Sequence, residues 1–599
     1  MTDPATHRPA LTTRRLLGEG VGAALIQPDG VIDWWCPNRF EAEPVLWALL
    51  DRRGGESRWM DVEAATWDPC PAGPTAHSTV RLGTQRVELW DGLVAVDGGG
   101  SMLVRLVRST GPAVAMVHRL RIGGFDGPSA PWIRDGDHVT NGPLVVSGGR
   151  PAIEAGEVVI PVTAETDRWS GFAVLAEAQA DADLVALVSA LRRAEATQAR
   201  ATARLRLPRQ HASRATDALR VMRSLTDPRT GAPVAAPTTS LPEAVGGERQ
   251  FDYRYSWLRD SGLAVGTASA LGHLSAAEHY LGFVGQLLER DGGLHPMSTT
   301  AGGEVPPERE VAEVHGWAGS RPVRVGNGAR DQVQLDAVAG VIAAVGAYVA
   351  SGGRLDRATW GIVDDLAGRL ADQRGGPTSG VWELRTPRRL VSEEIARWHG
   401  LEVALRLRRW TRPWLRRPAW RSTRNEARRR VEAAIDQLTG RLPQSFDDST
   451  DPTPDAAALT VATTGLLARR DPRAVRLVTA TIEALEHGPF LRRYPPADDG
   501  FEGIEGAFVP VSWWAVTALA CVGELDAART RADELCAALP PLQPEEWNVE
   551  EGTPLGNLPL LWSHMETARA LYTLEREELR RRVGTIGVLV WAAARYVRL

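Results

Sequence analysis

Lysine is absent from this chain, in which all 69 basic residues are arginine. A Schiff-base lysine for pyridoxal phosphate and a Walker-A lysine are therefore excluded. Cysteine is scarce. The four cysteines, Cys36, Cys70, Cys521 and Cys536, stand far from any C-x-x-C or zinc-site spacing, so we expect reduced, buried thiols. The sequence predicts neither a metal site nor a cofactor.

Other motifs are missing as well. No H-E-x-x-H or G-x-S-x-G motif occurs, which leaves zinc-protease and α/β-hydrolase chemistry without support. The C-terminal apolar run at 583–594 is too short to cross a bilayer and predicts a packed helix. An arginine pair at 14–15 precedes an apolar run, as in a twin-arginine signal, but Glu19 interrupts that run and no cleavage site follows. We therefore expect a cytoplasmic protein without a membrane partner.

The net charge of the chain indicates which classes of partner it can bind. A net charge of −5 and a pI near 6.2 argue against a nucleic-acid partner. The stretch Arg406–Arg430 runs against this balance, because its arginines are interleaved with Trp410, Trp414 and Trp420. Such a pattern suits RNA or an anionic ligand. In a chain that is acidic overall, we interpret it instead as the solvated face of an outer helix.

Tryptophan, by contrast, is in excess, with 21 residues against 7 tyrosines and 9 phenylalanines. The richest segment, Gly246–Asp260, carries four aromatic residues and ends in the pair Arg259-Asp260, directly before a helical pattern. An aromatic plate beside such a pair suits a sugar, because the apolar ring face stacks while the hydroxyls need convergent donors and acceptors. Taken alone, however, an Arg-Asp pair is more often a helix-terminal salt bridge.

Two later segments set carboxylates against tryptophans. They are Gly380-Val381-Trp382-Glu383 and Pro544-Glu545-Glu546-Trp547. One Trp-Glu pair in a loop is usually packing beside a solvated charge. Two such pairs together with the aromatic segment indicate glycoside chemistry, which works with two carboxylates.

The length of 599 residues predicts two domains, because it exceeds one ordinary core. Residues 1–180 are expected to form an antiparallel β-sandwich, because short apolar or alternating segments are separated by Gly, Pro and Asp clusters. Examples are 86–90, 102–107, 113–121 and 157–162. A helical and then extended linker is expected over 181–245, and a catalytic helical domain over 246–599.

Beyond Ser256 the pattern is almost wholly helical. Twelve helices are predicted, at residues 257–271, 275–290, 330–351, 355–373, 390–409, 423–440, 454–468, 472–486, 510–523, 524–539, 556–575 and 578–597. Long loops follow the even-numbered helices. Helices that alternate between an inner and an outer ring place all these loops on one rim, so the pattern predicts an (α/α)6 barrel with one pocket. An open solenoid of helical repeats is the alternative.

Several motifs follow one another in a recognisable order from Gly18 to the C-terminus. They are Ala24–Ile26, Asp29–Trp34, Ala236–Glu243, Tyr253–Asp260, Gly319–Asn327, Gly380–Glu383, Arg493-Tyr494, Glu505–Phe508, Glu545-Glu546, Leu555–Asn557 and Ser563-His564. This order resembles glycoside hydrolase family 15, the glucoamylase and bacterial trehalase family. The resemblance implies a β-sandwich followed by an (α/α)6 barrel, and hydrolysis of α-glucosides with inversion.

The resemblance also implies roles for single residues. Glu383 resembles the general acid of the family and Glu545 its general base, with the adjacent Glu546 as the alternative base. The residues predicted to bind substrate are Trp257, Arg259, Asp260, Arg321, Trp382, Arg493, Glu546 and Trp547. Trp317 and Trp562 are assigned to the core. Phe251 stands where tryptophan is common in the family, and this departure leaves the substrate open.

The resulting hypothesis is an inverting, exo-acting hydrolase that releases β-glucose from trehalose or short α-glucans, a small-molecule partner. Inversion requires the two carboxyl groups to lie roughly 6.5–9.5 Å apart, so that a water fits between one of them and the sugar. Trehalose is slightly favoured, because no separate starch-binding module is visible. The alternatives are a non-hydrolytic carbohydrate-binding protein and a tailoring enzyme acting on another small molecule in the same fold. Linkage and oligomeric state are left open.

Overall fold

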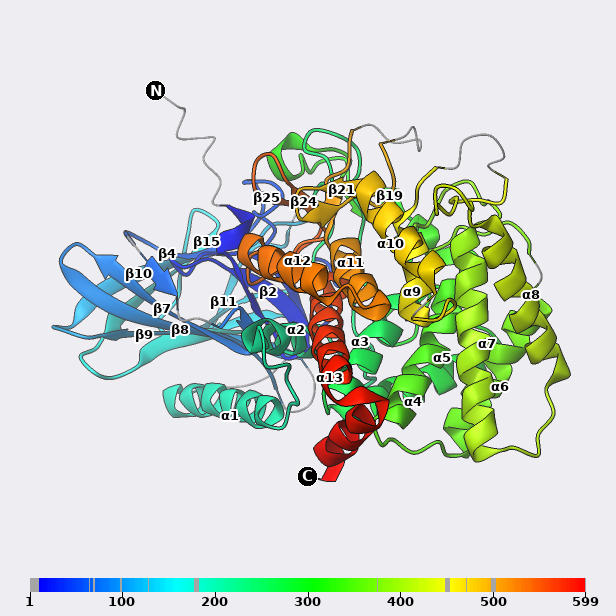
Figure 1. The fold of residues 1–599 in the computed structure, drawn as a ribbon. Coiled ribbons are helices and arrows are strands. Elements are labelled where there is room, and N and C mark those ends of the chain that lie inside the picture. Colours follow the sequence, from blue (N-terminus) through cyan, green and yellow to red (C-terminus); the bar gives the residue numbers. More distant parts are fainter. Residues whose placement is uncertain are drawn as a thin grey trace.

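The computed structural model of the chain describes residues 10–63, 65–67, 70–96, 100–127, 129–176, 183–373, 375–447, 453–469, 471–496 and 503–597. Within them a part rich in strands, on the left of Figure 1, precedes a helical part on the right. This order confirms the predicted succession of a sheet domain and a helical domain. The boundary predicted at residues 180–181 lies outside the described residues.

The strands of the N-terminal part form two sheets. They are β1 (Arg15–Leu17), β2 (Gly22–Ile26), β3 (Ile32–Pro37), β4 (Glu56–Trp59), β5 (Ala65–Trp67), β6 (Ala72–Gly73), β7 (Thr75–Leu82), β8 (Gln85–Ala95), β9 (Ser101–Ser109), β10 (Val114–Arg121), β11 (Ile133–Asp135), β12 (His138–Asn141), β13 (Leu144–Ser147), β14 (Ala152–Glu154), β15 (Glu157–Ala164) and β16 (Ser170–Ala176). One sheet has the order β14-β15-β10-β4-β3-β2-β1-β6 and the other β11-β12-β13-β16-β9-β8-β7-β5. The segments expected as strands fall in β8, β9, β10 and β15, and those predictions are confirmed.

The two sheets enclose an apolar core between them. Trp35 of β3 lies in the first sheet, and Leu103 of β9 and Phe172 of β16 lie in the second, yet all three belong to one buried cluster. Along β7 every second side chain is buried, which is the pattern of a strand with one face toward a core. Strand pairing is antiparallel in the pairs around this core, whereas β1 and β6 pair in parallel.

The helical part holds the remaining elements. Its helices, with the two that precede it, are α1 (Leu184–Ala203), α2 (Ala212–Ser224), α3 (Leu258–Ala270), α4 (Leu274–Asp291), α5 (Leu335–Ala350), α6 (Arg357–Asp372), α7 (Val391–Thr411), α8 (Pro418–Ala434), α9 (Thr460–Thr464), α10 (Pro472–Leu485), α11 (Val509–Val522), α12 (Leu525–Ala538) and α13 (Leu561–Val597). Short 3-10 turns are η1 (Leu11–Thr13), η2 (Trp317–Gly319), η3 (Gly328–Asp331) and η4 (Ala456–Leu459). Short strands are β17 (Ser256–Trp257), β18 (Met297–Ser298), β19 (Arg309–Glu310), β20 (Arg324–Val325), β21 (Glu486–His487), β22 (Phe490–Leu491), β23 (Ala507–Phe508), β24 (Glu546–Asn548) and β25 (Thr553–Leu555).

Composition separates these helices into an inner and an outer set. α5 and α11 are apolar on nearly every side, as expected of helices surrounded by protein. α6, α8, α10 and α12 each bury one face only. Side-chain caps set some of the starts: Asp356 accepts from the Thr359 N–H at the beginning of α6, and Asp471 accepts from the Arg473 N–H at the beginning of α10.

The packing follows this division. α3 contacts α5 and α13, α5 contacts α7, α7 contacts η4 and α9, and α11 contacts both α9 and α13. These six helical segments therefore contact one another in a closed cycle. From outside, α4 packs on α3, α6 on α5, α8 on α7, α10 on η4, α12 on α11 and α2 on α13. Each outer helix leads into an inner one, so the connecting loops gather at the same end of the inner helices.

The segment expected as a linker over 181–245 divides between the two parts. α1 lies against β7, β8 and β16 of the second sheet, whereas α2 packs on α13 at the other side of the boundary (Figure 1). The remainder turns at residues 228–230 and then runs without a helix into the aromatic segment. Hydrogen bonds from Ala235, Ala236 and Ser240 N–H groups hold it against the carbonyls of Tyr255, Tyr253 and Phe251.

Five of the predicted helices have wrong bounds. The helix predicted at 423–440 begins earlier, at Pro418. Proline suits the first turn, because a backbone N–H there would have no acceptor within the helix. The one predicted at 454–468 is the pair η4 and α9, and the one at 330–351 begins at Leu335 after η3.

The last two predicted helices, at 556–575 and 578–597, are both present in α13, but they do not divide near residue 576. α13 stays helical there, and its buried Glu577 forms ion pairs with Arg576 and Arg580. Its helical backbone is interrupted further on, at Gly584.

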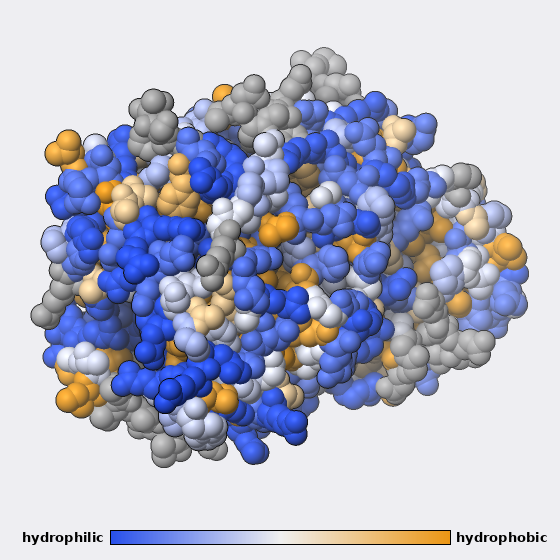
Figure 2. All heavy atoms as spheres, turned by 90° about the vertical axis from the view of Figure 1, so that its right-hand side faces the viewer, coloured by the Kyte–Doolittle hydropathy of each residue, from blue (hydrophilic) through white to orange (hydrophobic). Residues whose placement is uncertain are grey.

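The arginine-rich stretch covers the end of α7 and most of α8, at the outer side of the helical part. Its arginines pair with carboxylates of neighbouring helices: Arg417 with Asp364 of α6 at 2.7 Å and Arg424 with Glu402 of α7 at 2.5 Å. Figure 2 shows this side of the molecule as mainly hydrophilic, with scattered hydrophobic residues. We therefore interpret the arginine-rich stretch as an outer face that forms salt bridges with neighbouring helices. Among the described residues, no helix is both apolar and long enough to span a bilayer.

The sheets and the helices share one apolar core. Leu25 and Trp34 of the first sheet belong to the same buried cluster as Val221 of α2 and Val265 of α3. Trp34 is fully buried, and its indole N–H donates to the Pro237 carbonyl at 2.9 Å. Because no solvent layer separates the two parts here, we expect them to unfold together.

Trp34→Ala tests this shared core. Loss of the buried indole should lower the free energy of unfolding by about 3–5 kcal/mol, and sheet and helix signals should still be lost in one transition. Trp414→Ala, at a side chain that is 73% exposed, is the matched control and should change stability little. Urea unfolding followed by far-UV and near-UV circular dichroism makes the measurement. Two separated transitions would contradict the shared core.

Candidate active site

A cavity of about 630 Å³ opens where the loops from outer to inner helices gather. Its lining residues come from the loops that lead into α3, α5, α7, α11 and α13. Both predicted catalytic carboxylates, Glu383 and Glu545, are among them, although 161 positions of sequence and several helices separate them. The ring of helices thus brings them to one pocket.

Glu383 lies in a tight turn before α7. Its backbone has φ 57°, in the left-handed region, and the Glu383 N–H donates to the Gly380 carbonyl at 3.0 Å. A non-glycine residue held in this region stores strain of the kind found at functional sites. Trp257 Nε1 and Arg259 Nη2 both donate to the same oxygen, Oε1, at 2.8 and 2.9 Å. The other oxygen is the one available to a ligand.

Glu545 stands just before β24 and lines the same pocket. Its Oε1 accepts from the Tyr253 hydroxyl at 2.7 Å, and Oε2 accepts from the Asn557 N–H at 3.4 Å. Burial raises the pKa of Glu545 to about 7, although Tyr253 and Arg493 favour its charged form. A carboxyl poised there can exchange a proton near neutral pH.

An aromatic pair connects the two carboxylates. Tyr253 and Trp257 are edge to face, with ring centroids 5.5 Å apart. One ring donates to Glu545 and the other to Glu383. The spacing of the carboxylates is therefore set by the packing of two rigid rings.

The floor of the pocket carries paired charges. Arg259 contacts Asp260 at 3.5 Å, Asp336 at 3.3 Å and Glu383 at 2.9 Å, and it lies over the ring of Trp562 at 4.8 Å. Although burial opposes the charge, these three carboxylates raise the pKa of Arg259. Burial in turn raises the pKa of Asp260 to about 6. Asp260 lines the pocket and can accept from a ligand hydroxyl.

Three carboxylates surround Arg493 on another wall. Its Nη2 lies 2.5 Å from Glu505, 3.7 Å from Glu243 and 3.8 Å from Glu546. The ligand oxygens of these acids lie within 4.8 Å of one another, a spacing that suits a cation, and the Arg493 guanidinium supplies that positive charge. Burial raises the pKa of both Glu243 and Glu546, and neighbouring carboxylates add to the effect.

Trp382 lines the pocket behind Arg493. Its indole N–H donates to both oxygens of Asp455, at 2.9 and 3.0 Å, so the ring orientation is fixed from behind. The guanidinium of Arg493 lies 5.9 Å from the ring centroid. Trp382 therefore presents an apolar face next to a cation, as the sequence analysis expects of a sugar-binding wall.

Some predicted substrate-binding residues lie elsewhere. Arg321 is exposed and is not among the residues that line the pocket. Trp547 stacks on Phe490 at 6.0 Å inside an apolar cluster and does not line the pocket either. Glu546 is fully buried behind the wall, where its Oε2 accepts from the Gly506 N–H. Of the adjacent pair, Glu545 is the one that faces the cavity.

Other residues of the site were not predicted. Tyr253, Glu243 and Glu505 line the pocket and stand inside motifs named in the sequence analysis. Their place in these motifs is the sequence signal that could have identified them as site residues. Trp562 was assigned to the core but lines the pocket beneath Arg259. Asp336 follows a loop without a distinctive pattern, and nothing in the sequence marks it.

A second cavity, of about 540 Å³, lies between the inner helices. It is lined by residues along α3, α5, α7, α9, α11 and α13. Arg259, Val381 and Trp562 line both cavities. These side chains thus form a thin floor between the pocket and the interior of the helical ring.

The family described as "Glycosyl hydrolases family 15" matches residues 214–530. The chain belongs to this family. The matched span begins within α2 and contains Glu383 and Arg493, and Glu545 lies beyond its end.

Curated relatives carry the name trehalase. One from Mycolicibacterium smegmatis is 33% identical over 366 residues, which are 60% of this chain and 54% of the relative. One from Thermoplasma acidophilum is 30% identical over 356 residues, 59% of this chain and 61% of the relative. The chain therefore spans little more than half the length of these relatives.

A solved structure extends the similarity to the whole fold. The crystal structure of a bacterial glucoamylase complexed with acarbose aligns with a TM-score of 0.67, over 96% of each chain, at 11% identity. At that identity the match concerns the fold. It includes the sheet domain as well as the helices.

Gly556 offers a test of how tightly Glu545 is held. Gly556 has φ 71°, and a Cβ placed there would lie 2.5 Å from Glu545 Oε2. Gly552 has φ 64°, but a Cβ there meets nothing within 4 Å. Gly552→Ala should lose about 1–2 kcal/mol of stability from the left-handed backbone alone.

Gly556→Ala should lose a further ~1–3 kcal/mol from overpacking and should displace the Glu545 carboxyl. Urea unfolding of both variants and a crystal structure of Gly556→Ala measure the two effects. Equal losses, with Glu545 unmoved, would show that the carboxyl is not confined by this glycine.

Proposed function

We propose that this chain is an inverting, exo-acting α-glucoside hydrolase that releases β-glucose, with Glu383 as general acid and Glu545 as general base. The observation that carries the proposal is the pocket in which both carboxylates lie, each held by one ring of the Tyr253–Trp257 pair. Family membership supports the reaction class.

Glu383 would deliver the proton to the leaving group. Trp257 and Arg259 both occupy Oε1, so the proton is carried on Oε2 and passes to the glycosidic oxygen as the bond from that oxygen to C1 breaks. Glu383 is left as a carboxylate. The positive charge of Arg259 beside it stabilises that product.

Glu545 would activate the water. Its carboxylate takes one proton from a water on the opposite face of the sugar while the water oxygen bonds to C1, so the α-linkage becomes a β-hydroxyl. Tyr253 keeps the carboxylate oriented by donating to Oε1. Exchange with solvent then returns the proton from Glu545 and reloads Glu383.

The remaining lining would hold the glucose. Asp260 accepts from hydroxyls, Arg493 donates to them, and Trp382 covers an apolar face of the ring. Arg259 contributes mainly by fixing Glu383 and Asp336. Arg321 and Trp547 have no part in this proposal.

We also infer that the helices form an (α/α)6 barrel. The closed cycle of inner helices supports it, with α2, α4, α6, α8, α10 and α12 outside. In this arrangement α2 belongs to the catalytic domain, which would begin near Ala212 rather than at residue 246. α1 would remain with the β-sandwich.

Trehalose is the substrate that the relatives favour, because those compared carry the name trehalase. Purified protein should be incubated with trehalose, maltose, isomaltose, maltotriose and starch, and the first anomer released should be read by proton NMR. We expect β-glucose, with trehalose or another short glucoside preferred. Initial release of α-glucose would contradict inversion, and binding of sugars without any release would establish a carbohydrate-binding protein.

Leaving-group dependence separates the acid from the base. Glu383→Gln should lower kcat on trehalose by about 10²–10⁴-fold. It should be partly rescued on α-glucosyl fluoride, which departs with little help from an acid. Glu545→Gln should be inactive on both substrates.

Glu551→Gln, an exposed residue of the same hairpin, is the matched control. Initial rates on the two substrates make the measurement. Loss in Glu546→Gln together with full activity in Glu545→Gln would move the base by one position.

The pH dependence follows from the base. Glu545 acts when ionised, so activity should be lost as pH falls through its pKa of about 7. Tyr253→Phe removes a hydrogen bond that favours the charged form and therefore raises this pKa. The acid limb of kcat/KM should move up by about one to two pH units, since a hydrogen bond to a charge contributes about 1.5–3 kcal/mol.

Tyr348→Phe provides the control, because that hydroxyl donates to Glu278, away from the pocket, at 3.0 Å. Profiles of kcat/KM for the variants and the wild type make the comparison. A limb that stays in place in Tyr253→Phe would show that the limb does not report Glu545.

A further inference from the structure

The segment Phe251–Tyr255 separates the pocket from the β-sandwich. Its alternate carbonyls, at residues 251, 253 and 255, accept hydrogen bonds from the linker strand. Side chains alternate along such an extended chain. Phe251 and Tyr253 line the pocket, whereas Asp252 and Arg254 do not and are buried on the other side.

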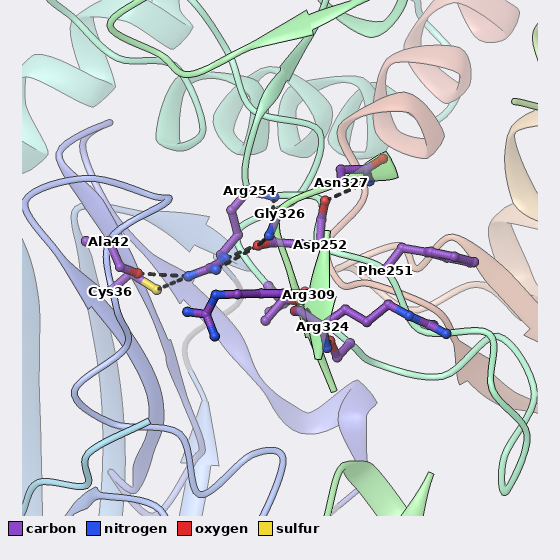
Figure 3. Close-up of polar contacts among 12 residues, drawn as sticks. Cys36, Ala42, Phe251, Asp252, Arg254, Arg309, Arg324, Gly326 and Asn327 are labelled. Atoms are coloured by element: carbon purple, nitrogen blue, oxygen red, sulfur yellow. Dashed lines mark hydrogen bonds and ion pairs between the residues drawn. The ribbon is translucent and has the colours of Figure 1, made fainter. Parts of the chain in front are cut away.

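Arg254 reaches from this segment into the β-sandwich. Its Nη1 donates to the Ala42 carbonyl at 2.8 Å and lies 3.7 Å from the Cys36 sulfur. Figure 3 shows the guanidinium directed away from the helices, toward these two residues. The side chain of Arg254 is 2% exposed and that of Cys36 is fully buried. The contact is therefore made inside the protein.

Asp252 locks the guanidinium in place. Arg254 Nε and Nη2 donate to its two oxygens at 2.8 and 2.7 Å, a bidentate pair of fixed geometry. The same carboxylate accepts from the Gly326 N–H at 3.2 Å, and Asn327 donates to the Asp252 carbonyl at 3.2 Å (Figure 3). The residues on both sides of Tyr253 are thus anchored on the face opposite the pocket.

We propose that Arg254 is a positioning residue for the general base: by fastening its segment to the Ala42 carbonyl of the β-sandwich, it sets where Tyr253 meets Glu545. The proposal rests on the proposed function, in which Glu545 activates the water. The sandwich then does more than cover the helices, because one of its backbone carbonyls helps to place the Tyr253 hydroxyl.

The segment around Tyr253 is rigid, and Arg254 lies close to Tyr253 along the chain. Arg254 is joined to Tyr253 by one peptide bond, and the ring of Tyr253 is already confined by Trp257. A shift of the guanidinium anchor is therefore passed to the hydroxyl, 2.7 Å from Glu545. A displacement of about 1 Å at a reacting group costs on the order of 10²-fold in rate. A buried ion pair is weak evidence for stability, so a role in geometry accounts for it better.

Arg254→Met tests this role, because it keeps the length of the stem and removes the guanidinium. We expect kcat to fall by about 10²-fold, with KM changed by less than about threefold, and the acid limb of kcat/KM to move up as in Tyr253→Phe. Arg254→Lys keeps the charge without the bidentate fork and should show a smaller effect in the same direction.

The decisive comparison is a double-mutant cycle. If Arg254 acts through Tyr253, adding Arg254→Met to Tyr253→Phe should lower kcat little further. Losses that multiply, or a fall in kcat with the acid limb unmoved, would overturn the proposal. Arg309→Met is the matched control: it removes an ion pair with Asp126 at 2.5 Å that also joins the two parts of the chain, but at an exposed place.

A readout without turnover separates this proposal from the proposed function. The chain has 7 tyrosines, so protein labelled with 3-fluorotyrosine should give a ¹⁹F resonance for each, and the one missing from Tyr253→Phe identifies Tyr253. We expect Arg254→Lys and Arg254→Met to move this resonance and Arg309→Met to leave it in place. An unmoved resonance in folded Arg254 variants would refute positioning, whereas a wild-type protein that cleaves no α-glucoside would refute the function instead.

Discussion

The two proposed catalytic carboxylates, Glu383 and Glu545, each accept a hydrogen bond from side chains of one short stretch of the chain. Tyr253 donates to Glu545, and Trp257 and Arg259 donate to Glu383. The donors are four and two residues apart, at the entrance of α3, so their relative positions depend on local geometry rather than on the long path of chain between the carboxylates. The loops that carry Glu383 and Glu545 need only deliver them to donors already in place. Preorganisation of this kind lowers the reorganisation that a reaction would otherwise require.

The absence of lysine gives the site a particular electrostatic character. Buried carboxylates are neutralised by guanidinium groups, which remain charged in a protein interior and present planar, forked donors. Arg493 serves three acids in this way, and Arg259 serves three others. Burial still raises the pKa of Glu545 to about 7. Arginine thus stabilises the group as a whole while leaving one member able to titrate near neutrality.

Much of the architecture was predictable, because strands and helices follow local periodicity. The sequence predicts Arg321, Glu383, Arg493 and Glu545 on loops of one rim, and all of these except Arg321 line one pocket. The failures have physical causes. Helix bounds depend on single residues that periodicity does not distinguish: α8 begins at Pro418, in its first turn, and α13 is interrupted at Gly584, which has φ 68°.

Side-chain direction was the harder problem. Trp547 is predicted to bind substrate and Trp562 to lie in the core, yet Trp547 stacks on Phe490 and Trp562 lies beneath Arg259 in the pocket. Arg321 shares a motif with Arg324, but Arg321 is exposed, whereas Arg324 donates to the Glu248 and Gln250 carbonyls inside the protein. Motifs identify a segment, and the neighbours of each atom decide which of its residues faces a ligand.

The thin floor between the two cavities gives the pocket a closed end. In an exo-acting hydrolase, the end of the substrate enters the pocket only as far as its closed end. The bond that is cut therefore lies one sugar from that closed end. Under the proposed function, Arg259, Val381 and Trp562 would form this closed end, because they line both cavities. The second cavity lies behind these side chains, so the depth to which a sugar enters depends on a single layer of side chains. Smaller side chains in this layer would deepen the pocket and lengthen the sugar unit that is removed, without altering either carboxylate or the ring of helices around them.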